Sequence, residues 1–251
     1  HTKGDFTDQT ALGKFAAMVD VVTLEWENVP LIALDTLTKY KPVYPKTDVL
    51  RVAQDRILEK SFARQHGIGT ADFVAVNSAD DLAVALEHFS RPAILKSTRM
   101  GYDGKGQVKI LPETYPFAAW EEMGSKAGIL EAFVPFEREV SVIVARRADG
   151  TMAAYPAVEN IHRNHILAET HAPANITPDV AQEAEQIART MAEKLDVVGL
   201  LAVELFVLKT PNLKGQRVVL NEIAPRPHNS GHWTMDACAC SQFEQLVRAV
   251  C

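Results

Sequence analysis

The sequence predicts a parallel α/β segment followed by a larger, mostly antiparallel α+β body. Residues 8–40 alternate between helical, strand and helical patterns, which is typical of a parallel α/β unit. Residues 92–159 instead carry a run of short strand patterns, and Asp149-Gly150 between two of them is a strong hairpin signal. A long amphipathic helix from Thr177 and two further strands complete this body.

Each predicted element depends on apolar periodicity and on capping signals at its ends. The elements are, in order, helices at 8–19 and 30–40 around a strand at 20–26, a linker or surface loop at 39–48, helices at 55–67 and 78–89, strands at 92–97, 106–111, 128–134, 138–147 and 151–159, a helix from 177, strands at 200–208 and 216–224, and a helix from 241. Pro30 suits a first helical turn, Asp55 an N-cap and Gly67 a C-terminal stop. Ser78 and Ser241 each begin a capping box.

Composition narrows the classes of function. The chain has 251 residues and a formal net charge of -6, so it repels polyanions, and we expect no nucleic-acid partner. The longest apolar run, residues 197–208, is too short to cross a membrane and contains Glu204, so we expect no membrane partner. Cys238, Cys240 and Cys251 lack the spacing of a zinc site and are interpreted as reduced cytosolic thiols.

The stretch RMGYDGKGQ, residues 99–107, is a glycine-rich connection between two predicted strands. Its order, G-x-x-G-x-G, is neither the dinucleotide fingerprint nor a Walker A loop, and no helix follows it. Such a connection can fold its backbone N–H groups over nucleotide phosphates. Turn geometry alone also explains glycines in a hairpin, so a loop without a ligand stays an alternative.

Charged side chains interrupt apolar strands at several positions. Lys96 lies in a strand apolar enough to be buried, where a phosphate would supply the counter-charge that a buried ammonium needs. Glu139 is a possible acceptor for ribose hydroxyls. Glu204 and the pair Asn221-Glu222 offer an all-oxygen ligand set of the kind that suits Mg²⁺. Salt bridges with Lys or Arg are the alternative for each carboxylate.

Taken together and in this order, Lys96, GYDGKGQ (101–107), LEAFVPFERE (130–139), Glu204 and NEIAPRPHNSGHWT (221–234) resemble the ATP-grasp superfamily. Within it, the sequence resembles the N5-carboxyaminoimidazole ribonucleotide synthetase family, the ATPase subunit of phosphoribosylaminoimidazole carboxylase. The similarity covers nearly the whole chain. The glycine stretch and the last motif are specific to this family, whereas the lysine and carboxylate spacing is shared across ATP-grasp ligases.

The resemblance implies an ATP-grasp fold preceded by the remnant of a parallel α/β, pre-ATP-grasp domain. Residues 1–45 would be the carboxy-terminal part of that amino-terminal domain, and residues 46–251 the ATP-grasp domain. Within the latter, a lid would span about 70–136 and a central domain about 137–251. The family's first amino-terminal strand and most of its carboxy-terminal domain are expected to lie outside this sequence.

The resemblance also implies a role for individual positions. The residues expected to act in catalysis are Lys96, Asp103, Lys105 and Arg226. Those expected to bind ATP are Arg56, Lys96, Gly101, Tyr102, Asp103, Gly104, Lys105, Gly106, Gln107, Glu131, Ala132, Phe133, Val134, Glu139, His162, Asn221 and Glu222. Those expected to contact the ribonucleotide are Glu25, Glu27, Tyr102, Asp103, Lys105, Arg226, His228, Asn229, Ser230 and His232. Glu204 and Glu222, helped by Asn221, would ligate Mg²⁺.

Two assignments keep alternatives. Glu25 and Glu27 share one face at the end of a strand, where ligands bind in open parallel sheets, and either can be the substrate-contacting acid of the family. His228 and His232 have a spacing that suits zinc only on a helix, but Pro227 and no apparent third ligand favour phosphate or substrate contact.

The expected reaction is ATP-dependent carboxylation of 5-aminoimidazole ribonucleotide with bicarbonate in purine biosynthesis, with ATP and Mg²⁺ as cofactors. A formate-dependent ribonucleotide transformylase of the same fold and a non-catalytic nucleotide-binding module are the alternatives. The resemblance further implies a cytoplasmic homodimer and a functional link to a separate mutase.

Overall fold

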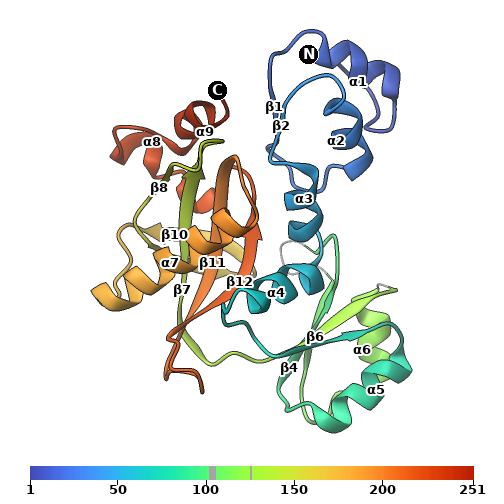
Figure 1. The fold of residues 1–251 in the computed structure, drawn as a ribbon. Helices are drawn as coiled ribbons and strands as arrows, with labels where there is room; N and C mark the ends of the chain where they lie inside the picture. Colours follow the sequence, from blue (N-terminus) through green and yellow to red (C-terminus); the bar gives the residue numbers. More distant parts are fainter. Residues whose placement is uncertain (102–105, 125) are drawn as a thin grey trace.

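The computed structural model describes residues 1–101, 106–124 and 126–251, and its helices and strands form three groups (Figure 1). An amino-terminal group lies at one end, a four-stranded sheet with its helices at another, and a six-stranded sheet carries the rest of the chain. The predicted combination of a parallel α/β segment with an antiparallel α+β body is confirmed by the pairing of the strands.

The amino-terminal group has a small parallel sheet. Its elements are α1 (Gln9–Ala16), β1 (Val22–Thr23), α2 (Leu31–Leu37), β2 (Val43–Tyr44) and α3 (Thr47–Ala53). Asp8 caps α1 by accepting hydrogen bonds from two backbone N–H groups. The predicted loop at 39–48 is wrong for Val43 and Tyr44, since Val43 is buried and pairs with Val22 in parallel. The prolines that suggested a break flank the strand, and Pro42 still accepts a hydrogen bond from Val22 through its carbonyl oxygen.

The four-stranded sheet is fully antiparallel, in the order β3-β6-β4-β5. Its elements are β3 (Phe73–Val76), α5 (Ala79–His88), β4 (Ala93–Ser97), β5 (Gln107–Ile110), α6 (Pro116–Met123) and β6 (Gly128–Ala132). One face packs on α5 and α6 through buried residues such as Leu82, Leu95 and Leu130. Lys96 follows Leu95 and therefore points to the opposite face, toward α4 (Arg56–Gln65).

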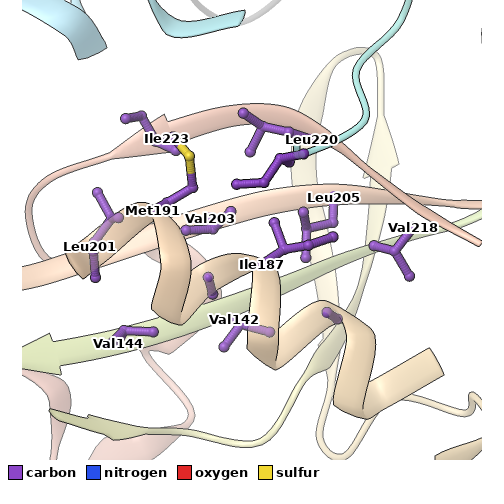
Figure 2. Packing of buried hydrophobic residues seen from close by; sticks show 14 of the residues in the cluster. Val142, Val144, Ile187, Met191, Leu201, Val203, Leu205, Val218, Leu220 and Ile223 are labelled. Carbon is purple, nitrogen blue, oxygen red and sulfur yellow. The ribbon is translucent and has the colours of Figure 1, made fainter. Parts of the chain in front are cut away.

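The six-stranded sheet has the order β10-β9-β7-β11-β12, with β8 paired to β7. Its elements are β7 (Phe136–Arg146), β8 (Met152–Ala154), β9 (Val158–Arg163), β10 (Ile166–His171), β11 (Gly199–Leu208) and β12 (Val218–Ala224), with α7 (Pro178–Lys194), a 3₁₀ turn η1 (Asn229–Gly231), α8 (Thr234–Ala237) and α9 (Gln242–Val250) around it. The α7 helix lies across one face, where Met191 and Ile187 pack on Val203 and Leu205 (Figure 2).

The opposite face of this sheet is divided between core and site. At one end, Ile143 and Ala202 pack under α9 through Leu246. Further along the same face, Ser141 and Glu204 lie directly opposite each other on β7 and β11, and their side chains share that face. Because α9 covers only one end, polar side chains occupy the remainder of the face.

Several elements were not anticipated from the pattern. The predicted strand at 151–159 is two strands, β8 and β9, because Pro156 between them has no N–H for the ladder. The short elements β3, α3, α6 and β10 had no prediction of their own. Among the described residues, no helix is long and apolar enough to span a membrane.

Candidate nucleotide and substrate site

Two adjoining cavities open between the four-stranded sheet, α4 and the polar face of the six-stranded sheet. The first cavity, of about 200 Å³, includes Glu27, Arg226 and His228 in its wall, and the second, of about 240 Å³, includes Lys96 and Glu139. The residues that line both cavities are Arg56, Gly101, His162, His165, Glu204 and Glu222. The two cavities therefore meet at a pair of carboxylates.

A β-bulge sets the direction of those carboxylates. Glu204 of β11 lies opposite Glu222 of β12, and the register shifts by one residue immediately beyond this pair. Simple alternation from Leu220 would turn Glu222 toward the apolar face under α7, but Ile223 takes that place instead. As a result, Asn221 and Glu222 both line the second cavity although they are adjacent in sequence.

Arg56 and Glu222 form an ion pair in the wall that the two cavities share. Arg56 Nη1 lies 2.8 Å from Glu222 Oε2, and Arg56 Nη2 reaches the carbonyl oxygen of Gly101 at 3.4 Å. Burial alone would raise the pKa of Glu222, but the charges of Arg56, Lys96 and Lys60 together outweigh burial and hold it at about 2. Glu222 is therefore an anion at neutral pH.

Lys96 has a protein partner as well as a place in the second cavity. Its Nζ lies 2.8 Å from Glu131 Oε2, and the other oxygen of Glu131 lies 3.4 Å from Lys60 Nζ on α4. Lys60 is 1% exposed and also donates to the carbonyl oxygen of Asn221 at 2.9 Å. Burial favours the neutral form of Glu131, but the two lysines outweigh it and lower its pKa. The buried ammonium of Lys96 thus has a counter-charge before any phosphate binds.

Sequence reasoning did not identify two charged residues of α4. Lys60 Nζ donates a hydrogen bond to the carbonyl oxygen of Asn221 on β12, and Glu59 Oε1 accepts a hydrogen bond from Ile223 N at 2.6 Å. Burial raises the pKa of Glu59 to about 8. A lysine and a glutamate on an amphipathic helix usually lie in solvent, so the sequence carried no signal for either position.

Part of the glycine connection lies at the second cavity. Gly101, Gly106 and Gln107 line it, while Tyr102, Asp103, Gly104 and Lys105 lie outside the described residues. Gly106 has φ of +68°, and a Cβ there would lie 2.7 Å from Ser97 Oγ, so this position requires glycine.

Glu139 and His162 form a pair on neighbouring strands at the second cavity. His162 Nδ1 lies 2.9 Å from Glu139 Oε2, and this neighbouring carboxylate raises the pKa of His162. The stacked rings of Phe136 and Phe206, 4.6 Å apart, also line this cavity and had not been predicted. Phe206 lies in a predicted strand and Phe136 between two of them, so neither position carried a signal for a cavity.

The predicted adenine-hinge residues are not brought into either cavity wall. Glu131 is buried in its ion pairs, and Phe133 is 45% exposed with Lys109 above its ring. Ala132 and Val134 also lie outside the two linings. The role of residues 131–134 as a hinge stays a prediction.

The first cavity distinguishes between the two candidate acids near the amino terminus. Glu27 lines it and forms an ion pair with Arg226, whereas Glu25 is exposed and outside the lining. Asn229 lines it too, as expected for a residue near substrate.

The two histidines of residues 221–234 lie in different surroundings. His228 lines the first cavity with Nε2 3.0 Å from Glu204 Oε1, whereas His232 is exposed and stacks on Phe243. Ser230 is fully buried and bonds His228, so direct substrate contact, which was predicted for Ser230, is not what the structure shows. In the described part of the chain, no three His, Cys, Asp or Glu side chains are grouped to hold a metal.

The donor set nevertheless fits a hard cation such as Mg²⁺. Glu204 and Glu222 each use one oxygen for a protein partner, and their second oxygens, like the Asn221 amide, form no hydrogen bond within residues 1–101, 106–124 and 126–251. Two carboxylates and an amide oxygen leave room for water and phosphate, which is the mode that Mg²⁺ prefers.

A cleft between two antiparallel sheets, with a lysine and a glycine connection on one side and paired carboxylates on the other, defines a nucleotide-polyphosphate-binding domain. The chain belongs to the ATP-grasp family: the model of the ATP-grasp domain matches residues 61–243, and that of the ribonucleotide synthetase preATP-grasp domain matches residues 1–54. The recognition made from the motifs is thereby confirmed at the level of fold.

Relatives with known names belong to the same subfamily that the motifs resemble, the N5-carboxyaminoimidazole ribonucleotide synthetases. The chain is 47% identical to a bifunctional purine synthesis protein purC/E of Dictyostelium discoideum, over all of this chain and 26% of that protein. It is 45% identical to an N5-carboxyaminoimidazole ribonucleotide synthase of Brucella melitensis, over 98% of this chain and 67% of that protein. The chain thus spans between a quarter and two thirds of these relatives.

Solved structures give the same result. An ADP complex of an N5-carboxyaminoimidazole ribonucleotide synthetase superposes with a TM-score of 0.92 at 41% identity, covering 99% of this chain and 64% of that one. The enzyme of Aspergillus clavatus, in complex with ADP and 5-aminoimidazole ribonucleotide, has a TM-score of 0.89 at 30% identity, covering 100% and 64%.

Proposed function

We propose that the protein containing this chain carboxylates 5-aminoimidazole ribonucleotide with bicarbonate, converting ATP to ADP and phosphate and giving N5-carboxyaminoimidazole ribonucleotide. One observation carries the proposal: the two cavities meet at Glu204 and Glu222. A nucleotide in the second cavity and a ribonucleotide in the first would place their reacting ends at this junction. The names of the relatives supply the identity of the substrates.

In the second cavity, the chain's task is to position ATP and to balance its charge. Lys96 and Arg56 present cations to the phosphates, while the backbone at Gly106 lies close enough to cover them. Glu139 is placed to accept hydrogen bonds from ribose hydroxyls, and the Phe206 ring offers the base an apolar surface. Glu204, Glu222 and Asn221 would hold Mg²⁺, which neutralises phosphate charge when bound.

At the junction, bicarbonate attacks the γ-phosphorus of ATP, the bond to ADP breaks, and carboxyphosphate forms. The exocyclic amine of the ribonucleotide then attacks the carboxyl carbon, or the CO₂ released from it, and phosphate leaves. Arg226 and His228 line the cavity that would hold the ribonucleotide, and the ion pair with Glu27 fixes the Arg226 guanidinium. Closure of the glycine connection would keep water from the labile intermediate.

Phosphate release by the intact parent protein tests the proposal. MgATP is supplied with and without aminoimidazole ribonucleotide, first in bicarbonate and then in formate. Release that needs the ribonucleotide, with carbon from labelled bicarbonate in the product, is the expected result. Release stimulated by formate would indicate a transformylase, and an absence of turnover with nucleotide still bound would indicate a binding module.

The domain division at residues 45 and 46, a cytoplasmic location, a homodimer and coupling to a mutase belong to the same proposal. The matched boundaries at 54 and 61 support a division in this part of the chain. Sedimentation of the parent protein, alone and with the mutase of its organism, measures both associations.

A further inference from the structure

A line of buried polar side chains runs behind His228, away from the cavities. Ser141 and Ser230 are fully buried, and Asn160 is 5% exposed. Asn160 Nδ2 lies 3.0 Å from Ser141 Oγ, Ser141 Oγ lies 2.8 Å from Ser230 Oγ, and Ser230 Oγ lies 2.8 Å from His228 Nδ1. The line ends at Glu204, whose Oε1 lies 3.0 Å from His228 Nε2.

The sheet brings these residues together by register. Ser141 of β7 is opposite Glu204 of β11, so the two side chains share a face. Asn160 of β9 is opposite Glu139, two residues before Ser141, and therefore lies on that face as well. The 3₁₀ turn η1, which follows β12, places the Ser230 hydroxyl within hydrogen-bonding distance of Ser141.

Each hydroxyl has a single proton, and the Asn160 amide at one end favours one direction for the hydrogen bonds in the line. The Asn160 amide donates to Ser141, so the proton of Ser141 is free to be donated to Ser230. Ser230 then donates to His228 Nδ1 through its hydroxyl, and its backbone N–H approaches the same nitrogen at 3.3 Å. With Nδ1 as an acceptor, the ring proton lies on Nε2, facing Glu204.

The opposite direction is disfavoured at the far end. A proton on Nδ1 would make Ser230 accept it and turn its own hydroxyl toward Ser141. Ser141 would then accept from both Ser230 and the Asn160 amide, and its own proton would have no acceptor within the line. Because the line is buried, no solvent is at hand to accept that proton.

We propose that Asn160, Ser141 and Ser230 are positioning residues that hold His228 with its proton on Nε2, so that His228 occupies one oxygen of Glu204 and leaves the other directed at the junction of the cavities. The catalytic consequence depends on the proposed function, in which Glu204 is a ligand of Mg²⁺. Partners that orient a ligand from behind in this way change metal affinity or rate by about 10- to 100-fold when they are replaced.

Long-range ¹H–¹⁵N spectra of the histidine side chains test the tautomer directly, with the His228 signals assigned by their loss in His228→Asn. In the unmodified protein we expect a single species protonated on Nε2. A signal showing the proton on Nδ1 would overturn the proposal, and this measurement requires neither a variant nor a substrate.

Three variants test the line itself: Ser230→Ala, Ser141→Ala and Asn160→Asp, the last exchanging a donor for an acceptor of the same shape. We expect each to give a detectable Nδ1-protonated species and to lower the rate of phosphate release by about tenfold or more, with more Mg²⁺ needed for half-maximal rate. Thr36→Val removes another buried hydroxyl, in the amino-terminal group, and should leave both readouts unchanged.

The outcomes separate the two proposals. If the variants lose stability but keep the tautomer and the rate, the line only satisfies buried polar groups and the positioning role is refuted. If the tautomer shifts as expected while phosphate release depends on another carboxyl or acyl donor, the positioning role holds and the proposed function fails.

Discussion

Replacing Lys60 with methionine should destabilise the protein by about 3 kcal/mol, because the change leaves a buried carboxylate without half of its counter-charge. Lys60 Nζ lies 3.4 Å from Glu131 Oε1, and at an effective dielectric constant of about 20 this separation corresponds to about 5 kcal/mol of attraction. Relief of the ammonium's own desolvation and of its repulsion from Lys96 offsets part of that loss. The charged hydrogen bond to the Asn221 carbonyl is lost as well.

Urea denaturation followed by circular dichroism measures the free energy of unfolding. Lys46→Met is the matched control: its ion pair with Asp196 is half exposed on both sides, so the expected change is at most about 1 kcal/mol. Adding Glu131→Leu to Lys60→Met should recover part of the loss, since the unpaired carboxylate is then gone. A loss below about 1 kcal/mol for Lys60→Met alone would refute the view that Glu131 depends on Lys60.

Three further changes have defined outcomes. Gly106→Ala should lower the free energy of unfolding by about 1–2 kcal/mol or more, because φ is +68° and the new Cβ would lie 2.7 Å from Ser97 Oγ. Adding Ser97→Gly should remove the part of this loss that comes from the clash with Ser97 and leave the part that comes from the positive φ. The pKa of His162 in the folded protein is above its usual 6.5, so the stabilising coupling between His162 and Glu139 is fully present below about pH 6.5 and is lost as the pH rises through the folded value. A double-mutant cycle by urea denaturation should show a larger coupling near pH 5.5 than near pH 9. Equal couplings at the two pH values would contradict this assignment. Glu222→Gln should reduce phosphate release by about 10-fold or more and raise the Mg²⁺ requirement, and unchanged turnover would remove Glu222 from the metal set.

The long periodic elements were predictable, and so was the placement of several charged residues in one cavity wall. The helix that begins after Asp55 and the strand around Glu204 have clear apolar patterns, and both are present as expected. Lys96, Glu204 and Glu222 also line one cavity, as their placement in apolar strands suggested. Charged residues in otherwise apolar strands carry this information because a buried charge requires a partner.

Other features depend on tertiary context. Strict alternation of side chains along β12 would place Glu222 on the apolar face, and the β-bulge turns it to the polar face instead. No local sequence pattern predicts the bulge. Phosphate was expected to neutralise Lys96, but in the structure Glu131 pairs with Lys96 through one oxygen. The other oxygen of Glu131 pairs with Lys60, which α4 brings to this position. His232 has the same residue type and motif as His228, yet the 3₁₀ turn between them directs it to Phe243. The bulge and the pairing of Lys96 both depend on partners far away in the sequence.

The charge cluster around Glu131 also has a mechanical consequence. Lys60 forms an ion pair with Glu131 of β6 and donates a hydrogen bond to the Asn221 carbonyl oxygen of β12, so it ties the four-stranded sheet to the six-stranded sheet. Lys96 joins the same cluster through Glu131. Separation of the two sheets would therefore break buried charged contacts, which favours a fixed spacing between Lys96 on one sheet and Glu222 on the other.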